Sequence, residues 1–146
     1  MVDRNLRDAA AAVLEDFVDG RITNVEFEQR FPASKDDPAL LAIRTESWFY
    51  YSDLSEHTLT GKRSLSREQG ALLERCALFL KTALEFQWPL PKYGLKYGLI
   101  RLLGFGWLLK RREKKEMSMG DVDVWPFLKR SDYERALGQQ REPENR

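Results

Sequence analysis

Residues 3–20 read DRNLRDAAAAVLEDFVDG, and this stretch decides the class of fold. Its apolar residues are spaced by three and four, which is the spacing of one face of an α-helix. They are Leu6, Ala9, Ala10, Val13, Leu14 and Phe17. Gly20 follows the last of them and is a typical C-terminal stop. The pattern predicts an amphipathic helix from Asp3 to Val18.

A short helix is predicted next. Thr23 or Asn24 can cap its first turn, because either side chain can accept a hydrogen bond from a free backbone N–H. Val25 and Phe27 are expected to point inward. Phe31-Pro32 ends the helix, because a residue before proline avoids the α conformation.

Asp37-Pro38 predicts the start of a third helix, since aspartate accepts orphan amide N–H groups and proline lacks a donor that the first turn does not need. We expect this helix to run to about Leu54. It carries four consecutive aromatic residues, which at roughly 100° per residue point around nearly the whole circumference. They are Trp48, Phe49, Tyr50 and Tyr51. Either the helix is central and covered on several sides, or these residues form a partner-binding patch.

A fourth helix is predicted after the capping box Ser66-Arg-Glu-Gln69 and is expected to stop at Trp88-Pro89. Its apolar stripe consists of Leu72, Leu73, Cys76, Phe79, Leu80, Ala83 and Leu84. Cys76 lies in the middle of the stripe. This favours an inert core thiol over a nucleophile, because apolar burial raises a thiol pKa.

Residues 92–116 contain a glycine-interrupted apolar run that leads into a basic cluster. Lys92-Tyr-Gly-Leu95 repeats directly as Lys96-Tyr-Gly-Leu99, and a period of four stacks like residues on a helix. This predicts a fifth helix. Four glycines leave a hairpin as the alternative, with Gly104-Phe-Gly106 as its turn.

The same segment holds the candidate membrane- or anion-binding residues, which are Trp107, Lys110, Arg111, Arg112, Lys114 and Lys115. A transmembrane span is not expected, because the 13-residue apolar run of residues 97–109 is interrupted by Arg101 and a span needs about 20 residues. Basic residues after tryptophan and leucine can bind an anionic surface. Apolar side chains around most of the helix nevertheless favour burial. Nucleic-acid binding is not expected, because the basic residues are clustered and diluted by Glu113 and Glu116.

The carboxy-terminal part is predicted to hold an extended segment and a last helix. Asp121 to Trp125 alternates like a strand, and Trp125-Pro-Phe127 should anchor it. Asp132 to Leu137 is predicted to be a short helix, followed by a disordered tail over residues 139–146. The predicted fold is therefore all-α, a single-domain bundle of about five helices over residues 1–138, with a short extended segment near Asp121–Trp125.

The composition fits one globular domain. The chain has 146 residues, of which 42% are hydrophobic, 12% aromatic and 32% charged. A single cysteine excludes an intrachain disulfide and a Cys-cluster zinc site, and favours a reducing compartment. The first residues lack the basic, then apolar, then small-residue pattern of a secretory signal peptide, so we expect a cytoplasmic location.

Charge is distributed unevenly along the chain. Residues 1–60 contain 6 Lys+Arg and 12 Asp+Glu, a net charge of −6, whereas residues 89–146 contain 13 and 8, a net charge of +5. The two halves can neutralise each other by docking, or can present opposite faces to partners. Internal docking is the favoured interpretation.

Signals for an enzyme are few. His57 is the only histidine, so a Ser-His-Asp or Cys-His arrangement would have to use it, with Asp53 or Glu56 as its partner. No nucleophile accompanies it, and a metal site would have two ligands at most. The sequence has no phosphate loop, GxSxG or HExxH motif, and we predict no cofactor or metal.

The tryptophan–proline pairs are the basis of a resemblance to other proteins. Residues 72–89, with Val124-Trp-Pro-Phe127 and Asp132-Tyr-Glu-Arg-Ala136 downstream, resemble a group of small uncharacterised bacterial proteins with the same punctuation. The resemblance implies a bacterial origin and a helical fold, and it implies no site residues.

The sequence therefore favours a non-enzymatic protein-binding domain. The specific hypothesis is a toxin-neutralising immunity protein that covers a basic toxin site with its acidic amino-terminal half or with the aromatic residues of the third helix. A peripheral membrane adaptor using residues 97–115 is the alternative, and an enzyme using His57 is a third class. Self-association through the aromatic residues stays open.

Overall fold

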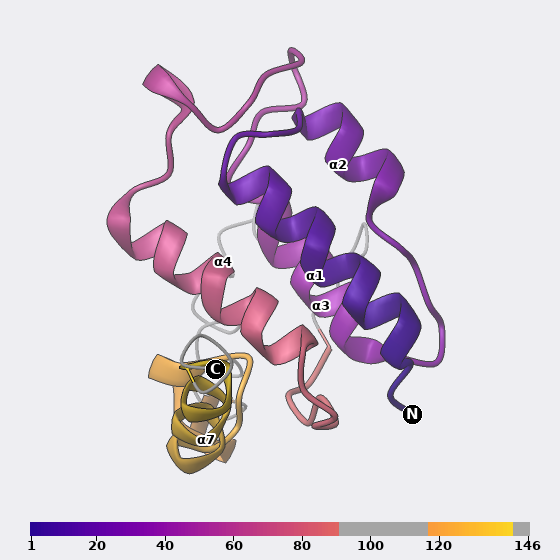
Figure 1. Cartoon of the computed structure of the whole chain (residues 1–146), viewed down its shortest axis with the longest axis vertical. Helices are drawn as coiled ribbons and strands as arrows, with labels where there is room; N and C mark the ends of the chain where they lie inside the picture. The colour runs from indigo at the N-terminus through magenta and orange to yellow at the C-terminus, as the bar shows by residue number, and fades with distance from the viewer. Residues whose placement is uncertain (91–116, 142–146) are drawn as a thin grey trace, which may run out of the picture.

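The computed structural model describes residues 1–90 and 117–141, and this part of the chain is all-helical, as predicted (Figure 1). Its α-helices are α1 (Arg4–Val18), α2 (Asn24–Arg30), α3 (Pro38–Trp48), α4 (Arg67–Leu80) and α7 (Arg130–Arg141). Short 3-10 turns lie at Gly61–Arg63, Met117–Met119 and Val122–Val124. No strand occurs within the described residues. The fifth helix or hairpin predicted for residues 92–116 lies outside them.

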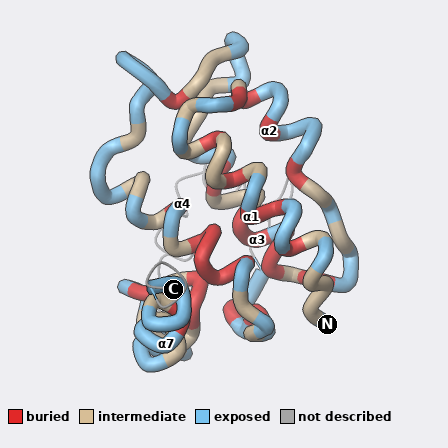
Figure 2. Tube along the Cα trace, viewed as in Figure 1, coloured by how far each residue is buried: buried red, intermediate tan, exposed pale blue. Residues whose placement is uncertain are grey.

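Helices α1 and α4 form the centre of the arrangement. Helix α1 packs against α2 on one side and α4 on the other, and α3 and α7 also pack against α4. The buried parts of these helices face the interior, whereas the loop that follows α3 and the outer face of α7 are largely exposed (Figure 2). The core is rich in aromatic side chains: Phe17 stacks on Phe27 at 4.5 Å, and Phe79 meets Phe127 edge-on at 5.1 Å.

The buried face of α1 differs from the predicted stripe. The structure buries Arg7, Ala10, Ala11, Leu14 and Phe17. Ala9 is exposed, while Leu6 and Val13 lie at the edges of the face. The stripe is rotated because Arg7, a charged residue, occupies the core side of the first turns.

Arg7 is fully buried in a two-pronged ion pair with Asp37, which is also fully buried. Its Nε and Nη2 donate to the two carboxylate oxygens at 2.6 and 2.9 Å. Burial alone would raise the pKa of Asp37. The hydrogen bonds from Arg7 and from the backbone N–H groups of Asp3 and Ala39, with the charge of Arg7, instead lower it below its usual 3.8.

Helix α4 ends at Leu80, earlier than the predicted Trp88-Pro89. The carbonyls beyond this point accept hydrogen bonds from two arginines of α1. Arg4 donates to Leu80 and Thr82, and Arg7 donates to Thr82 and, at 2.7 Å, to Leu84. These donors satisfy carbonyl groups that would otherwise require further helical turns.

The predicted helix starts are confirmed. Thr23 caps α2 and Ser66 caps α4, each within a complete capping box, and Asp37 caps α3. The expectation for Val25 was wrong, since its side chain is 37% exposed whereas Phe27 is fully buried. A seven-residue helix that packs on one neighbour buries only one side.

The expectation of an extended segment at Asp121–Trp125 was also wrong. The Asp121 side chain accepts a hydrogen bond from the Asp123 N–H at 3.1 Å, and this closes the 3-10 turn Val122–Val124. Phe127 is fully buried, as expected of an anchor. Helix α7 begins at Arg130 and reaches Arg141, so it is longer than predicted and extends into the first residues assigned to the tail.

Gly20 provides a test of the turn that ends α1. It has φ +71°, and the Arg21 N–H bonds to the Asp16 carbonyl at 2.8 Å, as in a Schellman motif. A Cβ at residue 20 would lie 2.6 Å from the Thr60 side chain. We expect Gly20→Ala to lower the free energy of unfolding by about 1 kcal/mol or more.

The matched control is Gly70→Ala in α4, where an added Cβ meets nothing within 4 Å. This change should raise the free energy of unfolding by roughly 0.5–1 kcal/mol, because alanine favours the helix. Urea unfolding followed by circular dichroism measures both variants. Effects of the same sign would contradict the assigned turn geometry.

Candidate functional site

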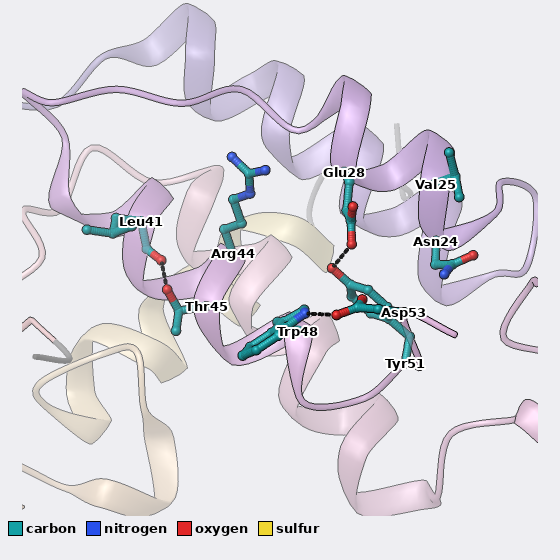
Figure 3. A pocket seen from close by; sticks show the side chains of 9 residues that line it. All are labelled: Asn24, Val25, Glu28, Leu41, Arg44, Thr45, Trp48, Tyr51 and Asp53. Atoms are coloured by element: carbon teal, nitrogen blue, oxygen red, sulfur yellow. Dashed lines mark hydrogen bonds between the residues drawn. The ribbon is translucent and has the colours of Figure 1, made fainter. Parts of the chain in front are cut away.

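A groove of about 640 Å³ lies between α2 and α3 (Figure 3). Helix α2 contributes one wall, α3 contributes the floor, and the turn that follows α3 contributes the other wall with Tyr51 and Asp53. The residues that line it are Asn24, Val25, Glu28, Leu41, Arg44, Thr45, Trp48, Tyr51 and Asp53. This groove combines apolar surface with three charged side chains.

One stripe of α3 forms the floor of the groove. Leu41, Arg44, Thr45 and Trp48 are spaced by three and four and therefore lie on one helix face. The opposite stripe, which includes Leu40 and Ile43, is buried in the core. The indole of Trp48 is 51% exposed and the side chain of Leu41 is 50% exposed. One interpretation of the sequence was that α3 is central and covered on several sides. The exposed stripe shows that it is not.

Two hydrogen bonds hold the polar side chains of the groove. The Trp48 Nε1–H donates to Asp53 at 2.9 Å, and the Tyr51 hydroxyl donates to Glu28 at 3.0 Å (Figure 3). Burial raises the pKa of Tyr51, and the hydrogen bond to Glu28 with the charges of Glu28 and Asp53 raises it further, against an opposing effect of Arg44. The hydroxyl is protonated at neutral pH even at its ordinary pKa of 10.0, so it can donate to Glu28.

Asn24 fixes the turn beyond α3 against α2. Its side-chain amide donates to the carbonyls of Ser52 and Ser55 at 3.0 and 3.2 Å, and its side-chain oxygen accepts from the His57 N–H at 2.9 Å. The Asn24 N–H in turn donates to the His57 carbonyl. Asn24 is buried, and these three partners satisfy its side-chain amide. The wall that carries Asp53 is thus built on α2.

The four consecutive aromatic residues do not form one patch. Helix α3 ends at Trp48 rather than near Leu54, and Phe49 is its C-cap. Trp48 and Phe49 are about half exposed, at 51% and 54%. Tyr51 packs edge-on against Phe17 at 5.4 Å, and Tyr50 donates to Glu46 at 2.5 Å. The helix stops here because the chain turns to bring Tyr51 onto the α1–α2 core.

His57 is not paired with either predicted partner. Asp53 is bound by Trp48, and Glu56 accepts from the Thr23 hydroxyl at 2.8 Å. His57 Nδ1 lies 2.8 Å from the Ser55 carbonyl, and its Nε2 is buried without a hydrogen-bond partner. His57 is not among the residues that line the α2–α3 groove.

Within the described residues, no cluster of three or more His, Cys, Asp or Glu side chains could hold a metal ion. None of the described helices is long and apolar enough to cross a bilayer. The membrane- or anion-binding candidates Trp107, Lys110, Arg111, Arg112, Lys114 and Lys115 lie outside the described residues.

Ion pairs within the described parts of the chain are mostly local. Arg21 pairs with Asp16 and Asp19, and Arg130 pairs with Asp121 and Asp123. Within the described part of the chain, no ion pair joins residues 117–141 to residues 1–60. The internal docking favoured from the charge pattern therefore finds no support in residues 117–141, and the basic cluster at 110–115 lies outside the described part.

Comparisons of the chain with protein-family models, with curated proteins and with solved structures gave no match. The α2–α3 groove and its chemistry are therefore the features of the molecule that bear on its function.

Cys76 provides a test of the prediction that no nucleophile is present in α4. Its side chain is fully buried, and burial raises the pKa of the thiol, with a smaller contribution from Glu46 and an opposing one from Arg75. We expect a disulfide reagent such as dithionitrobenzoate to label native Cys76 about 10³-fold or more slowly than the chain unfolded in guanidinium, because only opened molecules react. Comparable rates would show that the thiol is accessible and contradict the inert assignment.

Proposed function

We propose that this protein is a non-enzymatic protein-binding domain and that the α2–α3 groove is its binding surface. The observation that carries the proposal is the row of exposed apolar side chains on the groove. Trp48 is 51% exposed, Leu41 50% and Val25 37%. Tryptophan is enriched among residues that dominate binding energy, and grouped exposed apolar residues are typical of interaction surfaces.

Rigid placement of this surface supports the proposal. The indole of Trp48 is oriented by its bond to Asp53, and Asn24 ties the turn that carries Asp53 to α2. A surface that is ordered before binding loses less conformational entropy when the partner docks.

The charge around the groove supports the more specific hypothesis of a bacterial toxin-neutralising protein. Glu28 and Asp53 line the groove, and Glu26 and Glu56 both bond to Thr23 at the start of α2. An acidic rim of this kind attracts a basic partner surface and accelerates association. Neutralisation of a basic toxin site in the cytoplasm is one function that such a surface would serve.

The test is capture of a partner from the source cell at moderate salt, followed by affinity measurement with the purified pair. We expect Trp48→Ala to weaken binding of the captured protein about 30-fold or more, because it removes the largest apolar side chain of the groove. The matched control is Met119→Ala, which removes a 59% exposed side chain far from the groove in the sequence and outside its lining. It should bind as the wild type does.

Thermal melting would accompany these measurements, since Trp48→Ala removes a half-exposed side chain and should leave the helices folded. If the same partner binds wild type and Trp48→Ala equally well, the groove is not the binding surface.

A further inference from the structure

Arg44 stands at the centre of the α3 stripe, between Leu41 and Trp48, and its guanidinium points into the space between α2 and α3 (Figure 3). The side chain is half-buried. Within residues 1–90 and 117–141, no hydrogen bond or ion pair to the guanidinium of Arg44 is present. It is therefore a cation between two apolar side chains, Leu41 and Trp48, and its five N–H donors have no partner among the described residues.

The two acids of the groove are held by other donors. Glu28 accepts from the Tyr51 hydroxyl at 3.0 Å, and Asp53 accepts from the Trp48 indole at 2.9 Å. Tyr51 is fixed in turn by its edge-on packing on Phe17. Among the described residues that line the groove, each acid thus already accepts a hydrogen bond, whereas the one arginine has no hydrogen-bond or ion-pair partner.

An unmatched guanidinium of this kind is suited to a carboxylate. The planar fork of arginine binds the two oxygens of Asp or Glu in parallel, and such charge-assisted pairs are stronger than neutral hydrogen bonds. When a partner excludes water from the groove, the surrounding Leu41 and Trp48 side chains lower the local dielectric and strengthen the attraction. Charge complementarity therefore calls for an acidic residue opposite Arg44.

The shape of the surface favours a helical occupant. The floor runs from Leu41 to Trp48, which is about 10 Å along α3 at 1.5 Å per residue, or two helical turns. Helix α2 forms the other wall, packs on α1 and does not fill this space. A third helix laid against the stripe can interdigitate its side chains with those at positions 41, 44, 45 and 48.

We propose that the groove binds an amphipathic helix of a partner protein, which places an Asp or Glu carboxylate against Arg44 between two apolar residues that contact Leu41 and Trp48. The spacing on α3 sets these apolar residues three or four positions from the acid on each side. Basic residues at the edge of the same helix face Glu28 and Asp53. This inference rests on the proposed protein-binding function and specifies the chemistry of the partner.

The experiment is a selection from a displayed library of amphipathic helices that are randomised at all surface positions, with the full-length chain as bait. Binders to the wild type should share one Asp or Glu flanked by apolar residues at three or four positions. Selection against Arg44→Glu should instead enrich Lys or Arg at that same position. This exchange of charge is not expected from nonspecific attraction to the acidic rim.

The affinities of the purified helices for the wild type and for single variants then measure how much Arg44 contributes to binding. Arg44→Gln should weaken binding about 30-fold, and Arg44→Lys should weaken it less. The matched control Arg30→Gln removes an exposed arginine of α2 that does not line the groove, and it should change affinity less than threefold. Since no hydrogen bond or ion pair of the Arg44 guanidinium occurs within the described residues, we expect the Arg44 variants to remain folded.

The outcomes distinguish the two proposals. If binders depend on Trp48 but not on Arg44, or show no acidic position, the carboxylate inference is overturned and the protein-binding proposal stands. If the library returns no helix whose affinity falls on changing Trp48 or Arg44, the proposal that the groove binds a helix is wrong. The source-cell capture with Trp48→Ala then decides the protein-binding proposal by itself.

Discussion

The buried ion pair between Arg7 and Asp37 is the constraint on which the rest of the structure depends. Two charges at 0% exposure would be costly in an apolar interior unless nearly all their hydrogen-bonding groups were matched. Here the guanidinium also donates to the carbonyls of Thr82 and Leu84 and lies 5.3 Å from the Phe79 ring, while the carboxylate accepts from two backbone N–H groups. One interaction thereby joins α1, the first turn of α3 and the chain that leaves α4.

This constraint also places the groove. Asp37 begins α3, so the ion pair anchors the end of that helix from which the stripe of Leu41, Arg44 and Trp48 extends. The other wall is tied to α1 separately, through the stacking of Phe27 on Phe17. The walls are attached to the same helix by different contacts, and the Tyr51–Glu28 and Asn24 hydrogen bonds also join them to each other directly. The space along α3 from Leu41 to Trp48 is left open to a partner.

Local signals in the sequence predicted much of the helical framework. The caps at Thr23, Asp37 and Ser66, and the stop at Gly20, involve residues within a few positions of one another, so they can be recognised from spacing. Burial of Arg7 could not be predicted in this way, since its partner lies 30 residues away. The early end of α4 depends on donors from α1, and the Tyr51–Glu28 bond spans 23 residues. The spacing places Leu41, Arg44 and Trp48 on one helix face, but the exposure of that face beside α2 follows only from the three-dimensional arrangement.

A double-mutant cycle on Arg7 and Asp37 at pH 7 tests the central claim most directly. Arg7→Met keeps the apolar stem, and Asp37→Asn keeps a capping side chain. Each single change should lower the free energy of unfolding by about 3–5 kcal/mol, because it leaves a buried charge without its partner. The double variant should lose much less than the sum, with a coupling free energy above about 1 kcal/mol. Losses that add to within about 0.5 kcal/mol would contradict the claim that this pair holds the fold together.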